Sequence, residues 1–480
     1  MIIGRKREQK KLEQAYSSEK SQFITIYGRR RIGKTYLIDE FFKKKKCHFF
    51  HSMGLQHGST SDQLESFTTG LSETFFRGRL LQKPSNWKEA FAMLHNEVLE
   101  ADGKVVIFLD ELPWLATRKS GLMTQIDFYW NRYWSKMPKV IFIVCGSSAS
   151  WLIQKIIYNK GGLHNRTTLE IELRPFSLQE TRQYLIYRKI QLSDKQIVAL
   201  YMAIGGIPYY LDYVEPGLTP QQTIQRLFFN YDSPLKHEFD KLFDSLFDGA
   251  DAYKELVSII AKRREGIGRS EIELMTKLSS GGGHLTKRLK DLCLTGFIKE
   301  FVPWGKTRGE YYKVIDEFTL FFTQWLMPYT QTPFVEDHWI IKSQRPEYYA
   351  WAGYAFEAIC YKHIYQIVRA FKIQAINPIG SWRFIPRNNI EKGAQIDLII
   401  DRIDNALTLA EIKYSDKPFI LDKQYAAVLN QKREVFKKQA KPHKDLFLAL
   451  VAANGLKKTI YSEDIISGIA TIEDLFKELD

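Results

Sequence analysis

The sequence predicts an α/β fold, with a parallel sheet covered by helices near the N-terminus and smaller helical and mixed parts behind it. Three apolar runs indicate the sheet, at residues 22–27 (QFITIY), 105–110 (VVIFLD) and 139–145 (KVIFIVC). Continuous runs of Val, Ile and Phe are typical of strands buried on both faces. Because amphipathic stretches separate the runs, we expect the strands to lie parallel in one layer, joined by crossover helices.

Composition narrows the class of protein. The 480 residues are 45% hydrophobic and 14% aromatic, which excludes global disorder and allows several separate cores. The four cysteines lie far apart, which argues against a disulfide framework and a Cys-x-x-Cys zinc site. The chain has no run of 18 uncharged apolar residues and no apolar signal-peptide core. We therefore expect a cytoplasmic protein with reduced thiols and no membrane partner.

The charge balance favours a polyanionic partner. The chain holds 69 Lys and Arg against 55 Asp and Glu, a formal charge of +14, and residues 1–50 alone hold 14 basic against 5 acidic residues. Nucleic acid or a nucleotide fits such a balance. The alternative, a solvated helix face together with phosphate-binding residues, stays open.

The chain divides into five predicted segments. Residues 1–175 hold the parallel sheet, and residues 176–250 carry helical spacing that predicts a helical lid. Residues 251–330 are predicted to form three helices followed by a hairpin in which apolar and polar residues alternate. This order of elements is typical of a winged helix. Residues 331–348 contain two prolines and predict a linker, and residues 349–480 form a last domain.

The third helix of the winged-helix segment carries a basic set of residues. It would present Lys287, Arg288 and Lys290 to DNA, while Leu285 and Leu289 face the core. Many winged helices only pack on neighbouring domains, so DNA contact and packing both stay open for this helix.

A phosphate-binding motif follows the first predicted strand directly. Residues 28–35 satisfy G-x-x-x-x-G-K-[ST] between a strand and a helix, the context that this motif requires. The loop backbone would cradle the phosphates of ATP, Lys34 would neutralise them, and Thr35 would bind Mg²⁺. The predicted loop residues are Gly28, Arg29, Arg30, Arg31, Ile32 and Gly33.

The ends of the other two strands supply candidates for hydrolysis. Asp110 ends the second run and would hold Mg²⁺ through water, and Glu111 would orient and polarise an attacking water. Ser147, with Ser148 as the next candidate, follows the third strand and would sense the γ-phosphate. The motif and these acids together predict a P-loop NTPase core that hydrolyses ATP.

The first 330 or so residues resemble the archaeal-type ATPases of the STAND branch of AAA+ proteins. Ile2-Ile3-Gly4-Arg5 with Glu8 matches the N-terminal element of that branch, and Gly206-Ile207-Pro208 matches an element of its lid. The resemblance implies that Gly4, Arg5 and Pro208 lie at the nucleotide. It also implies ATP-driven switching and assembly into a homo-oligomer. Arg166 or Arg174 would then sense the γ-phosphate, although either could instead form a structural ion pair.

The last domain carries two carboxylates on a predicted hairpin. Residues 395–401 and 407–413 have the composition of two strands joined by a short polar turn, which predicts a hairpin. If the turn is centred on Asp404, the numbers of directly opposed residues sum to 808. Asp397 then faces Glu411. Opposed side chains stand about 5 Å apart at Cβ, and like charges there destabilise a sheet without a cation. Lys413 points to the same side as Glu411 because strand side chains alternate. The pattern predicts a Mg²⁺ site.

These residues resemble the D…ExK motif of the PD-(D/E)xK nuclease superfamily, and Glu357 matches its helical acid. Ile396 departs from the proline that is common before the aspartate. The resemblance implies a restriction-endonuclease-like fold in which Glu357, Asp397 and Glu411 hold the metal and Lys413 assists DNA cleavage. Two functions stay open: an ATPase that controls a DNA-binding or DNA-cleaving domain, or a STAND signalling switch whose vestigial nuclease-like domain binds a protein partner.

Overall fold

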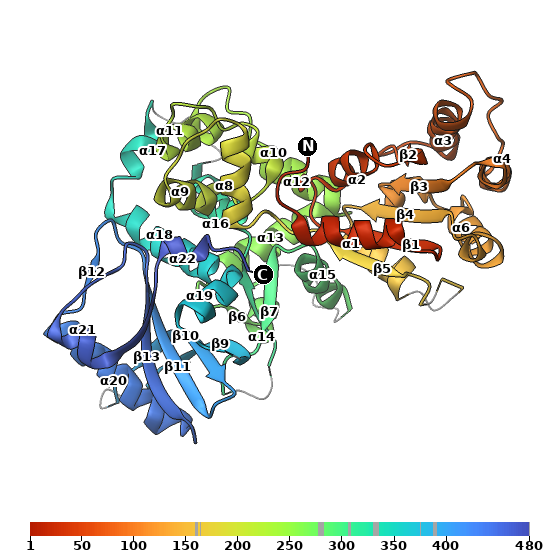
Figure 1. The fold of residues 1–480 in the computed structure, drawn as a ribbon. Helices are drawn as coiled ribbons and strands as arrows, with labels where there is room; N and C mark the ends of the chain where they lie inside the picture. The colour runs from red at the N-terminus through yellow and green to blue at the C-terminus, as the bar shows by residue number, and fades with distance from the viewer. Residues whose placement is uncertain are drawn as a thin grey trace. The chain divides into compact units, whose positions relative to one another are not determined.

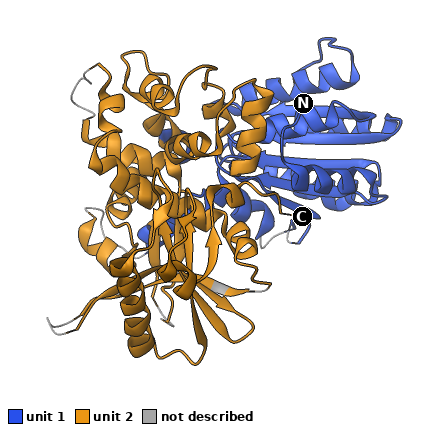
Figure 2. Cartoon of the chain, turned by 60° about the vertical axis from the view of Figure 1, so that its left-hand side comes forward, with its two compact units in different colours: residues 1–175, 244–248, 282–296 blue, residues 176–243, 249–281, 297–480 orange. Residues whose placement is uncertain are grey.

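The computed structural model forms two compact units, each of which is described by itself (Figures 1 and 2). Unit 1 comprises residues 1–175, 244–248 and 282–296, and unit 2 comprises residues 176–243, 249–281 and 297–480. The described residues are 1–158, 162–163, 165–276, 283–305, 309–329, 336–374, 376–386 and 391–479.

Unit 1 is built on a five-stranded, fully parallel sheet in the order β2-β3-β4-β1-β5. The three apolar runs form its three central strands, as predicted. The two edge strands were not predicted, because each is only partly buried and lacks a continuous apolar run. The strands are β1 (Gln22–Tyr27), β2 (Cys47–Met53), β3 (Lys104–Asp110), β4 (Val140–Gly146) and β5 (Leu169–Glu172).

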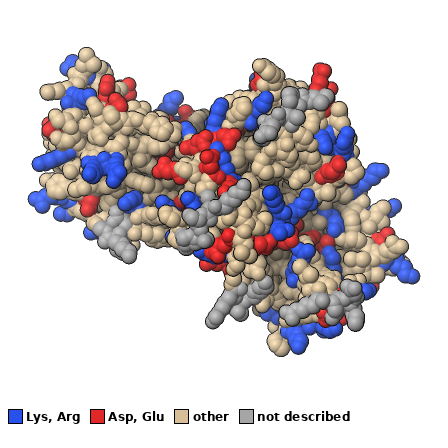
Figure 3. Space-filling model, turned by 180° about the vertical axis from the view of Figure 1, so that it is seen from behind, with Lys and Arg blue, Asp and Glu red and all other residues tan. Residues whose placement is uncertain are grey.

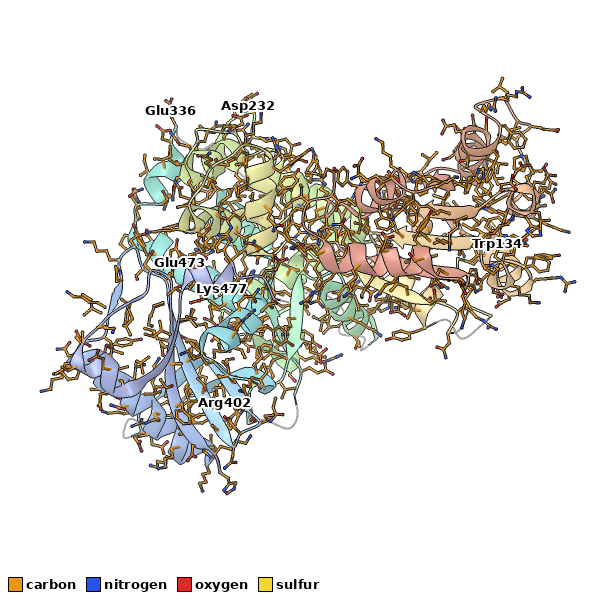
Figure 4. All side chains as sticks on the ribbon, viewed as in Figure 1. Trp134, Asp232, Glu336, Arg402, Glu473 and Lys477 are labelled. Atoms are coloured by element: carbon orange, nitrogen blue, oxygen red, sulfur yellow. The ribbon has the colours of Figure 1, made fainter. Side chains whose placement is uncertain are left out.

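Helices of unit 1 join these strands and bury an aromatic core against the sheet. Phe23, Phe91, Trp134 and Phe142 are fully buried in this core, and Trp134 is labelled in Figure 4. The helices are α1 (Lys6–Ser17), α2 (Lys34–Phe42), α3 (Thr60–Phe75), α4 (Trp87–Glu100), α5 (Leu112–Leu115), α6 (Leu122–Arg132), α7 (Ala149–Leu152) and α15 (Gly283–Leu294), with η1 (Trp134–Lys136) and η2 (Ile153–Ile157).

Unit 2 begins with the segment predicted as a helical lid, whose regular elements among the described residues are helices joined by turns. Capping boxes at Ser177, Ser193 and Thr219 set the starts of three of its helices. The elements are α8 (Leu178–Tyr187), α9 (Asp194–Ile204), α10 (Pro208–Leu211), α11 (Pro220–Ile224), η3 (Gln225–Phe229) and α12 (Glu238–Leu246), whose last residues belong to unit 1.

The segment predicted as a winged helix contains the expected three helices and the antiparallel hairpin. The third helix, α15, belongs to unit 1, and the additional strand β6 joins the hairpin in the order β6-β8-β7. Most of the predicted glycine turn at 281–283 lies outside the described residues. The unit 2 elements here are α13 (Ala250–Ala261), β6 (Ile267–Gly268), α14 (Arg269–Met275), β7 (Ile298–Phe301), β8 (Tyr311–Val314), α16 (Glu317–Trp325) and η4 (Met327–Tyr329).

The C-terminal part of unit 2 is a mixed five-stranded sheet in the order β15-β13-β11-β10-β9. Strands β9, β10 and β11 are antiparallel neighbours, while β13 lies parallel to β11 after a crossover through α20. Leu407, Leu409, Leu429 and Phe436 are buried between α20 and the sheet. The strands are β9 (Ile376–Phe384), β10 (Ala394–Arg402), β11 (Ala406–Lys413), β12 (Phe419–Ile420), β13 (Asp445–Ala452), β14 (Leu456–Lys457) and β15 (Ile466–Ala470).

The predicted linker 331–348 is partly helical. Residues 331–335 lie outside the described residues, but a short helix follows them, and its Trp339 is only 1% exposed. A buried tryptophan holds this stretch against the fold, unlike a free linker. The remaining helices are α17 (His338–Lys342), α18 (Pro346–Lys362), α19 (Ile364–Ala370), α20 (Lys423–Ala440), α21 (Ile460–Ile465) and α22 (Ile472–Leu475). Among the described residues, no helix is long and apolar enough to cross a membrane.

Candidate functional site

The loop between β1 and α2 has the backbone that a phosphate-binding loop needs. Gly28 and Gly33 have φ of +148° and +86°, values that favour glycine. A Cβ at Gly28 would lie 2.1 Å from the carbonyl oxygen of Leu173, so no larger residue fits there. The loop therefore turns tightly and starts α2 directly at Lys34.

Lys34 spans the mouth of this loop. It is 5% exposed, and its Nζ donates to the carbonyl oxygens of Gly28 and Arg29, each at 3.1 Å. The same nitrogen lies 3.4 Å from Oγ of Ser147, at the end of β4. The ammonium group thus joins the loop to the next strand of the sheet, as expected of a residue that meets phosphate between them.

Asp110 lies beside the end of the loop in a hydrogen-bonded pocket. Thr35 Oγ1 donates to its Oδ2 at 2.6 Å, and Cys145 Sγ donates to its Oδ1 at 2.6 Å. Burial alone would raise the pKa of Asp110, but the groups around it, His51 foremost, outweigh burial and lower the pKa. The carboxylate is therefore kept ionised next to the Thr35 hydroxyl, a donor pair that suits Mg²⁺.

Glu111 is held by the candidate sensor residue. The backbone N–H of Ser147 donates to Oε2 of Glu111 at 2.9 Å, and the Ser147 hydroxyl donates to the other carboxylate oxygen. Glu111 has a left-handed backbone, with φ of 46°, as the N-cap of α5. This strained turn directs its carboxylate toward the end of β4, beside the groups around Lys34.

His51 joins this group, although no motif in the sequence marks it as a site residue. Its Nδ1 lies 3.5 Å from Oδ1 of Asp39, and its Nε2 lies 3.6 Å from Oδ2 of Asp110. The ring stacks on Phe108, with the ring centroids 4.7 Å apart. Because His51 lies on the unpredicted edge strand β2, no local pattern could place it beside β3.

The N-terminal element contacts the loop through Arg5. Its Nη2 donates to the carbonyl oxygen of Ile32 at 3.1 Å, and its Nη1 donates to that of Arg174 at 2.5 Å. Arg5 is buried, and both it and Gly4 have positive φ. In the loop itself, the Arg30 guanidinium lies over the Trp114 ring, 5.4 Å from its centroid.

The candidate arginine sensors do not reach the loop with their side chains in this state. Arg166 is exposed, and its Nε lies 3.5 Å from the carbonyl oxygen of Gly162. The Arg174 side chain pairs with Glu172 at 2.7 Å, which fits the alternative of a structural ion pair. Within the described part of unit 1, no hydrogen bond or ion pair joins the Arg166 side chain to residues 28–35. Pro208 belongs to unit 2, so its contact with a nucleotide stays a prediction.

The C-terminal hairpin has the predicted register. Leu398 pairs with Ala410 and Asp401 with Leu407, so opposed numbers sum to 808. The same register places Asp397 opposite Glu411, and Asp397 Oδ2 accepts from the backbone N–H of Ile412 at 3.1 Å. The two carboxylates thus share one side of the sheet.

Lysines surround Glu411. Its Oε1 accepts from Lys413 at 3.0 Å, and both of its oxygens accept from Lys432, at 2.8 and 2.6 Å. Lys432 was not among the predicted residues, because the crossover through α20 brings it to β11 and no nearby pattern marks it. Burial would raise the pKa of Glu411, but the two lysines outweigh it and lower the pKa.

The other two acids are in a less favourable environment. Burial, and then the charge of Glu411, raise the pKa of Asp397 to about 6. Burial, and then the charge of Asp397, raise the pKa of Glu357 to about 7. These shifts show that the three carboxylates act on one another. However, no group of three or more His, Cys, Asp or Glu side chains among the described residues is arranged to hold a metal ion. The Mg²⁺ site of Glu357, Asp397 and Glu411 therefore stays a prediction.

The predicted DNA-reading residues lie on α15. Lys287 and Lys290 are exposed, whereas Arg288 is half-buried. This helix packs against α7 within unit 1. Figure 3 views the molecule from behind and shows Lys and Arg scattered among Asp and Glu on that side. Of the two interpretations left open for this helix, packing is observed, and DNA contact stays a prediction.

Comparison with known proteins agrees with the geometry of unit 1. Residues 2–214 match the family described as an ATPase domain predominantly from Archaea. An uncharacterized protein of Methanocaldococcus jannaschii is 24% identical over 422 residues, which cover 87% of this chain and 88% of the relative. An uncharacterized ATP-binding protein of the same organism is 46% identical over 46 residues, 10% of this chain and 78% of that protein.

A solved structure shows the same fold over a larger part of the chain. The Walker-type ATPase of Pyrococcus abyssi has a TM-score of 0.50 at 18% identity, covering 67% of this chain and 96% of its own. The loop geometry, the Asp110 pocket and the family match all concern the same N-terminal part. Residues 2–214 are an archaeal-type ATPase domain with a P-loop fold.

Proposed function

We propose that this protein binds ATP with Mg²⁺ and hydrolyses it at the site formed by Lys34, Asp110, Glu111 and Ser147. The observation that carries this proposal is the convergence of Lys34 and Glu111 on Ser147. The donor set fits the metal, because the Thr35 hydroxyl and an ionised Asp110 lie 2.6 Å apart at the start of α2. Bound Mg²⁺ would neutralise charge on the β and γ phosphates.

Each residue has a separate role in this proposal. Lys34 exchanges its bonds to the loop carbonyls for bonds to phosphate oxygens. Asp110 and Thr35 hold the ion, and the loop backbone from Gly28 to Gly33 orients the phosphates. Glu111 accepts a proton from the attacking water once Ser147 releases its carboxylate, because an oxygen that accepts from Ser147 is less available as a base.

We further propose that the nucleotide state controls a C-terminal domain that acts on DNA. The formal charge of +14 and the basic residues of α15 support DNA as a partner. The register that opposes Asp397 to Glu411, with Lys413 two residues beyond Glu411, supports a nuclease-like domain. The family resemblance supports a homo-oligomer, and we propose a cytoplasmic location.

One observation favours the second candidate, a signalling switch whose nuclease-like domain binds a protein. Lys413 and Lys432 already neutralise Glu411 without any ion. A carboxylate that is already paired with two lysines needs no cation, as expected of a vestigial site.

Two assays with the purified full-length protein test these proposals. Phosphate release from ATP and Mg²⁺ should be lost in Lys34→Ala and retained in Lys43→Ala, a control at the exposed end of α2. Linear, circular and single-stranded DNA are then incubated with Mg²⁺ or Mn²⁺, with and without ATP. ATP-dependent binding or cutting supports the first candidate. ATP turnover with no effect on any DNA supports the second.

A further inference from the structure

A lysine from outside the nuclease-like sheet reaches its acidic side chains. Lys313 lies on β8, and its Nζ is 3.8 Å from the ring centroid of Tyr361 on α18. The Tyr361 hydroxyl donates to the backbone carbonyl of Asp397 at 2.6 Å. Glu357 lies one turn before Tyr361 on the same helix face. The β7-β8 hairpin thus places a positive charge near Glu357 and against the tyrosine ring whose hydroxyl bonds the Asp397 backbone.

The position of this hairpin is fixed by several contacts within unit 2. The backbone N–H of Trp304, just after β7, donates to the carbonyl oxygen of Ser381 on β9 at 3.1 Å. The Trp304 ring lies 5.1 Å from that of Phe436 on α20. Arg383 on β9 pairs with Glu265, just before β6, at 2.6 Å. The hairpin is therefore docked on the nuclease-like sheet by backbone, aromatic and ionic contacts.

Charge in this region is partly compensated without a metal. Three carboxylates (Glu357, Asp397 and Glu411) share the site with three ammonium groups (Lys313, Lys413 and Lys432). Lys413 and Lys432 pair directly with Glu411. Lys313 acts on Glu357 through its charge, although no direct ion pair joins these two described residues. Of these three lysines, Lys313 is the one that comes from the β7-β8 hairpin.

We propose that Lys313 balances the charge of Glu357 in place of a divalent cation, so that its ammonium group weakens metal binding at the acidic site. This inference rests on the metal-dependent part of the proposed function. A divalent ion near Glu357 would be repelled by the adjacent ammonium group, and the repulsion is strong where water is excluded. Removal of the Lys313 charge ends that repulsion and leaves the carboxylates with too little positive charge, which favours the ion.

Mn²⁺ binding to the full-length protein without nucleotide tests this inference, with electron paramagnetic resonance as the readout. Lys313→Met should bind Mn²⁺ about tenfold or more tightly than wild type, because one positive charge is gone. Lys313→Arg keeps the charge and should bind as wild type does. Lys299→Met is the matched control, because Lys299 is exposed and pairs directly across the hairpin from Lys313. Circular dichroism in chelator checks folding, and Lys313→Gln replaces the methionine variant if that variant does not fold.

Asp397→Asn identifies the part of the Mn²⁺ signal that comes from this site, since binding at the P-loop is common to all variants. Equal binding in wild type and Lys313→Met, both above Asp397→Asn, overturns the inference and leaves the metal-dependent function standing. Binding that is the same in all variants, Asp397→Asn included, shows that no metal site exists and overturns both. A gain in Lys299→Met equal to that in Lys313→Met also overturns the inference, because any positive charge on the hairpin would then suffice.

Discussion

The hydroxyl of Thr35 donates a hydrogen bond to Oδ2 of Asp110 over 2.6 Å, which joins the start of α2 to the end of β3. We expect Asp110→Asn to abolish Mg²⁺-dependent ATP hydrolysis, because the amide has no charge to hold the ion. Nucleotide affinity should change less in chelator than in Mg²⁺, as measured with a fluorescent ATP analogue. Asp102→Asn, an exposed acid just before the same strand, is the control. Wild-type turnover in Asp110→Asn would remove this residue from the metal site.

Glu111 and Lys34 are expected to separate hydrolysis from binding. Glu111→Gln should bind ATP but slow its hydrolysis by about 10²- to 10⁴-fold, the usual contribution of a general base. Lys34→Ala should weaken binding itself. Ser147→Ala should slow turnover more than Ser148→Ala, because the Ser147 hydroxyl lies 3.4 Å from Nζ of Lys34, where it would contact the γ-phosphate. Single-turnover kinetics measure the rate of the hydrolysis step in each variant. An unchanged rate in Glu111→Gln excludes Glu111 as the general base.

The proposed DNA binding through α15 should have a defined salt signature. Charge reversal at Lys287 and Arg288 should weaken binding to a labelled duplex. It should also make the dependence on salt shallower, by a slope of about 0.9 for each phosphate that these side chains no longer neutralise. Lys83→Glu, an exposed basic site elsewhere in unit 1, should change neither. Binding that ignores both salt and these reversals favours a protein partner.

Asp397 should be a source of instability in chelator. Its folded pKa of about 6 lies above the ordinary value of 3.8, so the folded state gains protons, and stability, as pH falls from 7 toward 4. Asp397→Asn should therefore melt higher than wild type at pH 8, by about 2 kcal/mol in unfolding free energy, and lose this advantage near pH 4. Thermal melts in EDTA measure this, with Asp404→Asn in the exposed turn as control. A lower melting temperature for Asp397→Asn at pH 8 contradicts the repulsion.

His363 should make unit 2 sensitive to acid. Its Nε2 accepts from the backbone N–H of Leu178 at 3.1 Å, while its Nδ1 faces the carbonyl oxygen of Ile359 at 2.9 Å. Burial lowers its pKa from 6.5 to about 4, so the unfolded chain takes up the proton first as pH falls through this window. Stability should therefore fall by up to about 3 kcal/mol between pH 6.5 and 4.

The readout for His363 is urea unfolding at several pH values, followed by tyrosine and tryptophan fluorescence. His363→Gln should flatten the pH dependence, and the exposed His443→Gln should not. An unchanged slope in His363→Gln would assign the acid sensitivity to other groups.

Much of the ATPase domain and the C-terminal hairpin could be predicted from the sequence, because local rules govern them. The conformations of Gly28 and Gly33, the ammonium of Lys34 and the hydroxyl of Thr35 all lie within one strand-loop-helix segment. The central strands are buried on both faces, so their apolar runs are continuous. The register of β10 and β11, in which the numbers of opposed residues sum to 808, follows from a short turn around Asp404. Turn length sets which residues oppose one another.

Only the tertiary structure decided which distant residues join these sites. Edge strand β2 brings His51 to Asp110, the crossover through α20 brings Lys432 to Glu411, and the β7-β8 hairpin brings Lys313 to Tyr361. Each partner is separated from its site by tens of residues, and none carries a local pattern of its function. The sequence by itself determined where the carboxylates lie, since backbone pairing is local. Long-range packing determined the charges around them, and these charges decide whether the acidic site can bind a metal.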